Sequence, residues 1–119
     1  MRYVCFVYEN AGEMSARTGT DEQAITQEHL DYDDRLRADG HFIDAAALQA
    51  PPASKVVRKR NGKIVVSDGP FVETKEMVGG YVLAAADNLA QAVEIARGCP
   101  GLDYDIAVEV RPVEQMPPI

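Results

Sequence analysis

The sequence predicts an α+β fold of the ferredoxin-like type, a split βαβ arrangement with a β-hairpin inserted between its halves. Segments with strand and helix periodicity follow one another in the order strand, helix, strand, hairpin, strand, helix, strand. The pair Asn61-Gly62 is the strongest short-range signal for the hairpin. The length of 119 residues allows one domain, residues 1–119, and not two.

The first half of the pattern is a strand followed by a long helix. Tyr3 to Tyr8 is apolar on both alternating faces, as in a central strand covered on both sides. After a polar loop, Thr20 is expected to cap a helix that runs from about Asp21 to Asp39 and stops at Gly40. The stripe of this helix that is expected to face the sheet consists of Ile25, His29, Tyr32 and Leu36.

The middle of the chain contains the predicted hairpin. The segment from Phe42 to Gln49 is compatible with either a strand or a loop, because its alanine run is uninformative. The segments Ser54 to Arg60 and Lys63 to Ser67 are predicted strands, joined at Asn61-Gly62 by a type I′ turn.

The second half repeats strand, helix and strand, predicted over Gly80 to Ala86, Asn88 to Arg97 and Asp105 to Val113. Asp87 is expected to cap this helix. Its buried side is predicted to comprise Leu89, Ala92, Val93 and Ala96. In the last strand two sets are expected to face opposite ways, namely Ile106, Val108 and Val110 against Ala107, Glu109 and Arg111.

The predicted sheet has an apolar face that its own helices leave open. Two helices cover only one face of the sheet, and the remaining face must find other cover. The simplest cover is a second copy packed sheet against sheet, so a homodimer is expected. The alternative is that the hairpin folds back over that face.

The composition argues against nucleic acid and membranes as partners. The formal charge is −7, whereas phosphate binding needs clustered Lys and Arg. The basic cluster between Lys55 and Lys63 surrounds the hairpin tip and is interpreted as a solvated edge. With no long apolar run and no signal-peptide pattern, a cytoplasmic location is expected. Cys5 is expected to be buried and Cys99 partly exposed, without a disulfide framework.

His29 and Asp68 are the candidate catalytic residues. Asp68 lies at a constrained turn before Gly69-Pro70, where an acid either caps the backbone or faces a pocket. An imidazole exchanges protons near neutral pH, and a carboxylate bound to one ring nitrogen makes the other a better base. The alternative is that His29 is a core histidine bonded to a backbone carbonyl and that Asp68 only caps its own turn.

Four further residues are candidates for substrate binding, each with core packing or pairing as the alternative: Tyr8, Tyr32, Phe71 and Arg111. A metal site is not expected, because the two histidines are twelve residues apart without clustered acids or thiols. No cofactor is expected either. Gly79-Gly80 lacks the lysine and helix of a phosphate loop and is interpreted as a close backbone approach.

The run Asp68-Gly69-Pro70-Phe71, continued by residues 73–76 and by Gly79-Gly80-Tyr81, resembles the DGPF signature of the YCII-related proteins. The first strand and the closing run from Val108 to Val113 also fit, so the resemblance covers essentially the whole chain. It implies a dimeric α+β-barrel, as in muconolactone-isomerase-like and antibiotic-monooxygenase-like proteins. It also implies a His and an Asp in a cleft, which here match His29 and Asp68.

The resemblance implies little about the reaction. Some relatives resemble hydrolytic or dehalogenating enzymes of aromatic catabolism, and many of the DGPF branch are encoded near extracytoplasmic-function sigma factors. Two hypotheses follow. The first is a hydrolase-like enzyme that uses His29 and Asp68 as an acid–base pair on an unknown small molecule. The second is a non-catalytic ligand-binding or regulatory protein that works with such a sigma factor.

Overall fold

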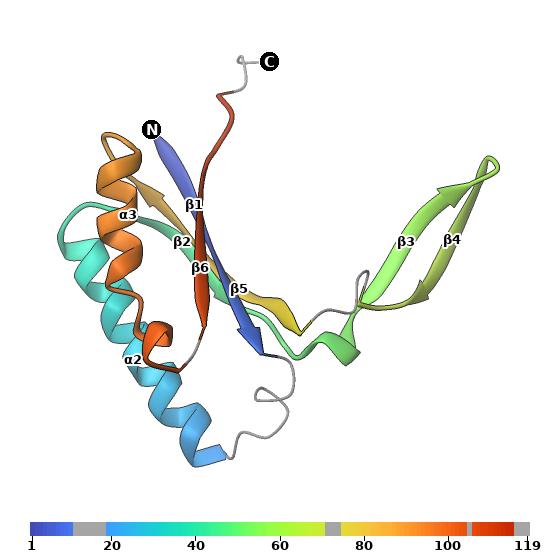
Figure 1. Ribbon diagram of the computed structural model, residues 1–119, viewed down its shortest axis with the longest axis horizontal. Helices are drawn as coiled ribbons and strands as arrows, with labels where there is room; N and C mark the ends of the chain where they lie inside the picture. Colours follow the sequence, from blue (N-terminus) through green and yellow to red (C-terminus); the bar gives the residue numbers. More distant parts are fainter. Residues whose placement is uncertain (11–18, 71–74, 105, 116–119) are drawn as a thin grey trace.

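A computed structural model describes residues 1–10, 19–70, 75–104 and 106–115 and confirms the ferredoxin-like α+β fold (Figure 1). Its strands and helices, in chain order, are β1 (Arg2–Asn10), α2 (Gly19–Ala38), β2 (Phe42–Ala47), β3 (Lys55–Arg60), β4 (Lys63–Asp68), β5 (Glu76–Ala85), α3 (Leu89–Arg97) and β6 (Ala107–Pro112). Two 3-10 turns, η1 (Pro51–Ala53) and η2 (Pro100–Tyr104), complete it. The segment from Phe42 to Gln49, whose sequence is compatible with either a strand or a loop, therefore contains strand β2.

Strand β1 lies at the centre of a four-stranded antiparallel sheet with the order β2-β5-β1-β6. Its alternating side chains divide between the two faces of the sheet. Tyr3, Cys5 and Val7 lie on the face that the helices cover, where each exposes 7% or less of its surface. Val4 and Phe6 lie on the other face and are half-buried. The sheet thus has one closed face and one open face.

Helices α2 and α3 both pack on the closed face, as Figure 1 shows. They contribute to the core, with β1 and β5, the buried side chains Tyr32, Leu36, Ala92, Ile95 and Ala96. The predicted stripe of α2 is therefore confirmed at Tyr32 and Leu36. Burying such side chains stabilises the fold by roughly 1.5–3 kcal/mol for each large one.

The predicted buried side of α3 is wrong at two positions. Leu89 and Val93 are 48% and 41% exposed. The stripe at the sheet is instead Ala92, Ile95 and Ala96, which has the i, i+3, i+4 spacing of a single helical face. Val93 follows Ala92 directly in the sequence, so its side chain points away from that face. Leu89 is the first residue of the helix.

Both predicted helix caps also differ from the structure. Asn88, not Asp87, caps α3, because its side-chain oxygen accepts a hydrogen bond from the Gln91 N–H at 2.9 Å. Helix α2 already begins at Gly19, so Thr20 lies inside the helix rather than at its cap. Its C-terminal end is as predicted, since Gly40 follows it with a φ of 80°.

Cys99 is buried, with 5% of its surface exposed, and not partly exposed as predicted. The reason is tertiary, because the η2 turn that follows it packs beside α2. There the Tyr104 hydroxyl donates a hydrogen bond to Glu28 at 3.0 Å. Cys5 is buried as predicted.

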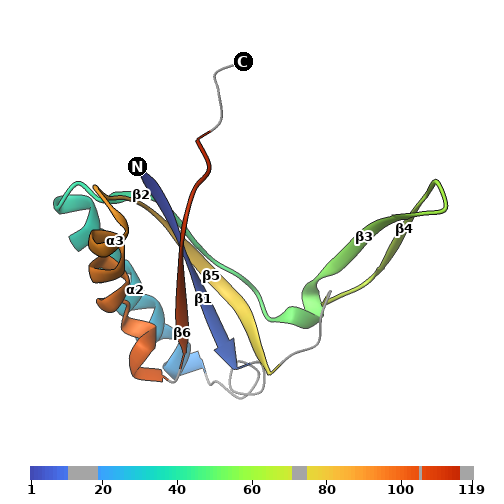
Figure 2. The same cartoon turned by 45° about the horizontal axis from the view of Figure 1, so that its top comes forward.

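The hairpin β3–β4, called the arm below, forms a separate two-stranded sheet. Figures 1 and 2 show that it projects away from the four-stranded sheet, on the side opposite the helices. The alternative in which the hairpin folds back over the open face is therefore wrong. Asn61 and Gly62 at its tip have φ of 50° and 77°, which confirms the type I′ turn.

The projecting arm makes the chain extended for its length. Its radius of gyration is 16.2 Å, against about 13.5 Å for a compact domain of this length. Among the described residues, no helix combines the length and the apolar character that crossing a bilayer requires.

Candidate functional site

A pocket of about 550 Å³ lies where α2 meets the edge of the sheet formed by β2 and β5. Helix α2 contributes Ile25, Thr26, His29, Leu30 and Asp33, and β1 contributes Val7 and Glu9. The remaining wall is the segment from Ala45 to Ala50 together with Gly79 to Val82. A volume of this size suits a small organic molecule, and the mostly aliphatic wall suits one with an apolar body.

His29 is the residue of the predicted catalytic pair that lines this pocket. It lies on the sheet-facing side of α2, as predicted, and is half-buried. Its Nδ1 lies 2.9 Å from the carbonyl oxygen of Ile25, one helical turn earlier. Because a carbonyl only accepts, Nδ1 must carry the proton, and the neutral ring then keeps its lone pair on Nε2.

Two carboxylates line the same pocket as His29. Asp33 follows His29 by one turn of α2, and Glu9 lies near the end of β1. Burial raises the pKa of the Asp33 carboxyl, and a positive charge on His29, when that ring is protonated, lowers it. A carboxylate near an imidazole stabilises the imidazolium that forms when the ring takes a proton.

The glycine pair next to the pocket is a close backbone approach, as predicted. A β-carbon on Gly79 would collide with the Glu9 carboxylate, so glycine at this position makes room for that acid in the pocket. A β-carbon on Gly80 would lie 2.7 Å from the carbonyl oxygen of Ala46, which would push β2 away from β5.

Asp68, the other member of the predicted pair, does not line the pocket. It is the last residue of β4, at the base of the arm, and its exposed carboxylate forms an ion pair with Lys55. The neighbouring Gly69 N–H donates to the Ser54 carbonyl at 2.9 Å. His29 and Asp68 are thus not brought together within the pocket wall of one chain.

Three of the predicted binding residues, Tyr8, Tyr32 and Arg111, lie outside the pocket. Tyr8 and Arg111 are on the open face, where both donate hydrogen bonds to Glu109, at 2.9 and 3.0 Å. Tyr32 is a core residue whose hydroxyl donates to the Ile95 carbonyl. Phe71 lies outside the described residues.

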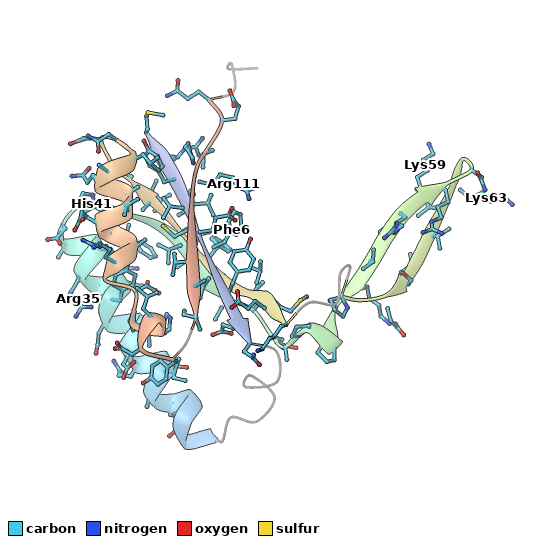
Figure 3. All side chains as sticks on the ribbon, viewed as in Figure 1. Phe6, Arg35, His41, Lys59, Lys63 and Arg111 are labelled. Atoms are coloured by element: carbon cyan, nitrogen blue, oxygen red, sulfur yellow. The ribbon has the colours of Figure 1, made fainter. Side chains whose placement is uncertain are left out.

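The network on the open face is a set of coupled polar groups. Hydrogen bonds from Arg111 and Tyr8 lower the pKa of the Glu109 carboxyl. The same carboxylate raises the pKa of the Tyr8 hydroxyl, because it stabilises the protonated form. The Arg111 guanidinium also lies 5.5 Å from the centre of the Phe6 ring. Figure 3 shows Phe6 and Arg111 on the side of the sheet toward the arm.

The described residues contain no cluster of three or more His, Cys, Asp or Glu side chains placed to hold a metal ion. Within the pocket, His29 is the side chain whose ring can exchange a proton near neutral pH. A neutral imidazole with its lone pair on Nε2 accepts a proton from a water or a substrate, with Glu9 and Asp33 as the acids of the same wall.

Glu9 and Asp33 were missed from the sequence, although periodic signals mark both. Asp33 is four residues after His29, so it shares the same helix face. Glu9 continues the alternation of Tyr3, Cys5 and Val7 and therefore belongs to the closed face. The end of β1 hid this signal, because a polar residue after an apolar strand was interpreted as the start of a loop.

Comparison with known proteins shows the family. Residues 1–117 match the YCII-related domain, so the chain belongs to the YCII-related family. The chain is also similar to an uncharacterized protein of Rhizobium meliloti (strain 1021). The two are 26% identical over 114 residues, which cover 95% of this chain and 92% of that protein.

Proposed function

We propose that this YCII-related chain is a small-molecule enzyme of the hydrolase-like kind, with His29 as general base. The observation that supports the proposal is the state of the His29 ring. Its Nδ1 proton is held by the Ile25 carbonyl at 2.9 Å, and the ring lines a pocket of about 550 Å³. A fixed tautomer and an accessible cavity are the two conditions that general base catalysis places on a histidine.

The acid that works with His29 is proposed to be Asp68 or Asp33. Asp68 carries the family signature and pairs across the arm with Lys55, which follows the pocket-wall residue Ala50 by five residues. Asp33 lines the pocket itself, and its pKa is raised by burial, which favours a proton donor. The two candidates are distinguished by replacing each with asparagine.

The active unit is proposed to be a homodimer formed through the open face. That face has no helix over it (Figure 1), and it presents half-buried apolar and aromatic side chains, including Val4, Phe6, Tyr81 and Leu83. A second copy packed on it would complete their burial by a twofold contact.

Turnover of a panel of aryl esters and halogenated aromatics tests the catalytic proposal. We expect His29→Gln to lower kcat/KM by roughly 10²- to 10⁴-fold, because a general base contributes that much. The carboxylate partner should show a similar loss in Asp33→Asn or in Asp68→Asn.

His41→Gln is the matched control. His41 is also half-buried with its Nδ1 held by a carbonyl, that of Ala85 at 2.9 Å, but it does not line the pocket. Its replacement should leave kcat/KM unchanged. Equal activity of His29→Gln and the wild type would remove His29 from the mechanism. Binding of panel compounds without turnover would favour the ligand-binding or sigma-factor-linked alternative.

A further inference from the structure

The arm lacks the cover that a two-stranded sheet normally needs. Both of its strands pair only with each other in the described part of the chain. A two-stranded hairpin alone is marginally stable in water, and stable hairpins pack against something else. The arm therefore needs a surface that the rest of its own chain does not supply.

The register of the arm places three of its five aliphatic side chains on one face, and the other two, Val56 and Val65, on the opposite face. Val57 lies directly opposite Val66, and Ile64 lies opposite Lys59, so these three aliphatic residues share one face. They are 65%, 62% and 66% exposed, respectively. Such a face, free of cover and aliphatic at its centre, is typical of a surface that packs against a partner.

The arm as a whole is basic, with Lys55 and Lys59 on the same face as Val57, and the rest of the chain is acidic. Residues 55–68 contain five Lys or Arg and one Asp, a net charge of +4, whereas the other 105 residues contain seven basic and eighteen acidic residues, a net charge of −11. A second copy of this chain is thus a partner of complementary charge for the arm. A nucleic acid would meet the arm favourably but the remainder of the chain unfavourably.

The arm and the open face of the sheet lie on the same side of the molecule. Figures 1 and 2 show the helices on one side of the sheet and the arm on the other, and Figure 3 shows Phe6 and Arg111 on the arm side. A second copy seated on the open face would therefore lie beside the arm. By twofold symmetry, its own arm would lie beside the first copy.

The exposed area of the chain is large enough for such an interface. The chain exposes 8251 Å². A compact monomer of 13.0 kDa would expose roughly 6,300 Å², about 1,900 Å² less. A standard stable interface needs about 800 Å² from each partner.

We propose that the arm is a dimerisation clasp that lies against a second copy of this chain, with the Val57, Ile64 and Val66 face in the contact. This inference rests on the dimer of the proposed function and adds a second contact to it, outside the open face. It does not depend on His29 or on the reaction.

The test compares Val57→Thr/Val66→Thr with the wild-type chain in sedimentation equilibrium. Threonine keeps the branched shape and the strand preference of valine and replaces one methyl group with a hydroxyl, which makes the face less apolar. Because the dimer contains two arms, the double variant changes four side chains, and we expect the dimer dissociation constant to rise by at least about tenfold. The matched control is Val93→Thr on the exposed side of α3. This substitution should leave the dimer dissociation constant unchanged.

Hydrogen exchange gives a second measurement on the unaltered protein. The amides of residues 55–68 should become protected as the protein concentration rises through the dimer dissociation constant. The amides of α3 should show no such dependence. This readout does not require that the variants fold.

The outcomes separate the clasp from the proposals on which it rests. A variant dimer as tight as the wild type, or arm amides that exchange equally at all concentrations, would overturn the clasp while the open-face dimer stands. A wild-type chain that stays monomeric would overturn both the dimer and the clasp, and it would leave the His29 assay unaffected. Arm protection that appears only when an RNA or DNA oligonucleotide is added would also overturn the clasp.

Discussion

The four-stranded sheet and the arm use the same residue type in opposite environments. Val7 and Val82 in the sheet are 7% and 6% exposed, whereas Val57 and Val66 in the arm are 65% and 62% exposed. All four valines lie in antiparallel strands, in which successive side chains point to opposite faces of the sheet. The difference shows that strand periodicity decides which residues share a face, while the elements packed on that face decide whether it is core.

The two regions also differ in how they are anchored. Two helices bind the sheet from one side, and the buried Tyr32 hydroxyl joins α2 to α3 through the Ile95 carbonyl. The arm is anchored at its base, where the Gly69 N–H donates to the Ser54 carbonyl and the Ser54 hydroxyl donates to the Pro51 carbonyl at 2.6 Å. We therefore expect the arm to open locally without unfolding of the sheet and helices.

The largest expected difference between the regions concerns the loss of one aliphatic side chain. Leu36→Ala should lower the free energy of unfolding by roughly 2–5 kcal/mol, because Leu36 is 6% exposed and leaves a cavity. Ile64→Ala, at a position 66% exposed, should change it by less than about 0.5 kcal/mol in dilute protein. Urea denaturation of both variants checks this, and equal losses would contradict the view that the arm lies outside the core.

Alkaline pH should act on the core through buried Cys and Tyr side chains, which residues 55–68 lack. Burial raises the pKa of the Cys5 thiol from 9.0 to about 11, and burial also raises the pKa of Tyr32. The folded state then holds protons that the unfolded state releases. Stability contributed by Cys5 is fully present below pH 9.0 and is lost as the pH rises through about 11.

Between these pH values the expected loss from Cys5 is roughly 1.4 kcal/mol per pH unit. Urea midpoints at pH 7.5, 9 and 10 measure it. Cys5→Ala should be less stable at neutral pH but should show a shallower slope above pH 9. An unchanged slope would mean that the Cys5 thiol is not the titrating group.

Two glycines with the same backbone strain separate local from global opening. Gly62 at the arm tip and Gly40 after α2 have φ of 77° and 80°, and a β-carbon on either would meet no atom within 4 Å. An L-residue at such φ costs roughly 1 kcal/mol. Gly40→Ala should lower the global free energy of unfolding by that amount.

Gly62→Ala should instead leave the urea midpoint unchanged in dilute protein and speed amide exchange in residues 55–68 by about fivefold. Hydrogen exchange and urea denaturation on the same samples make the comparison. A fall in the global midpoint equal to that of Gly40→Ala would show that the arm and the sheet unfold as one unit.

The smallest expected effect concerns the ion pair at the base of the arm. The side chains of Lys55 and Asp68 are 66% and 84% exposed, so solvent screens their attraction. Lys55→Ala should change stability by less than about 0.5 kcal/mol, as should Arg97→Ala, which removes the exposed pair with Glu94 on α3. A loss above 1 kcal/mol for Lys55→Ala alone would make this pair a structural anchor of the arm.

The order of the elements could be predicted because it depends on local signals. Alternation marked the strands, the Ile25 to Leu36 stripe marked α2, and Asn61-Gly62 marked the hairpin tip, which has the φ angles that the pair favours. The predictions were wrong where the burial of a residue depends on another element that packs against it. Cys99 is buried by the packing of the next turn beside α2, a contact that no window of sequence contains.

The candidate site was predicted only in part, for a similar reason. The face of α2 that carries His29 follows from helical periodicity, and the structure places His29 in the pocket wall. The neighbours of His29 come from other elements, and Glu9 reaches the pocket because Gly79 on β5 leaves room for its carboxylate. Asp68 belongs to the signature, but it does not lie in that wall.

The amino-acid sequence by itself determined which residues share a face in each strand and helix, where the hairpin turns and which family the chain resembles. Periodicity, turn preference and signature are properties of short segments, and they need no long-range contact. Only the tertiary structure decided which face of the sheet is closed, where the arm points and which acids accompany His29. Those outcomes depend on how segments far apart in the chain pack together. The free energy of that packing is a property of the contact and cannot be derived from either segment alone.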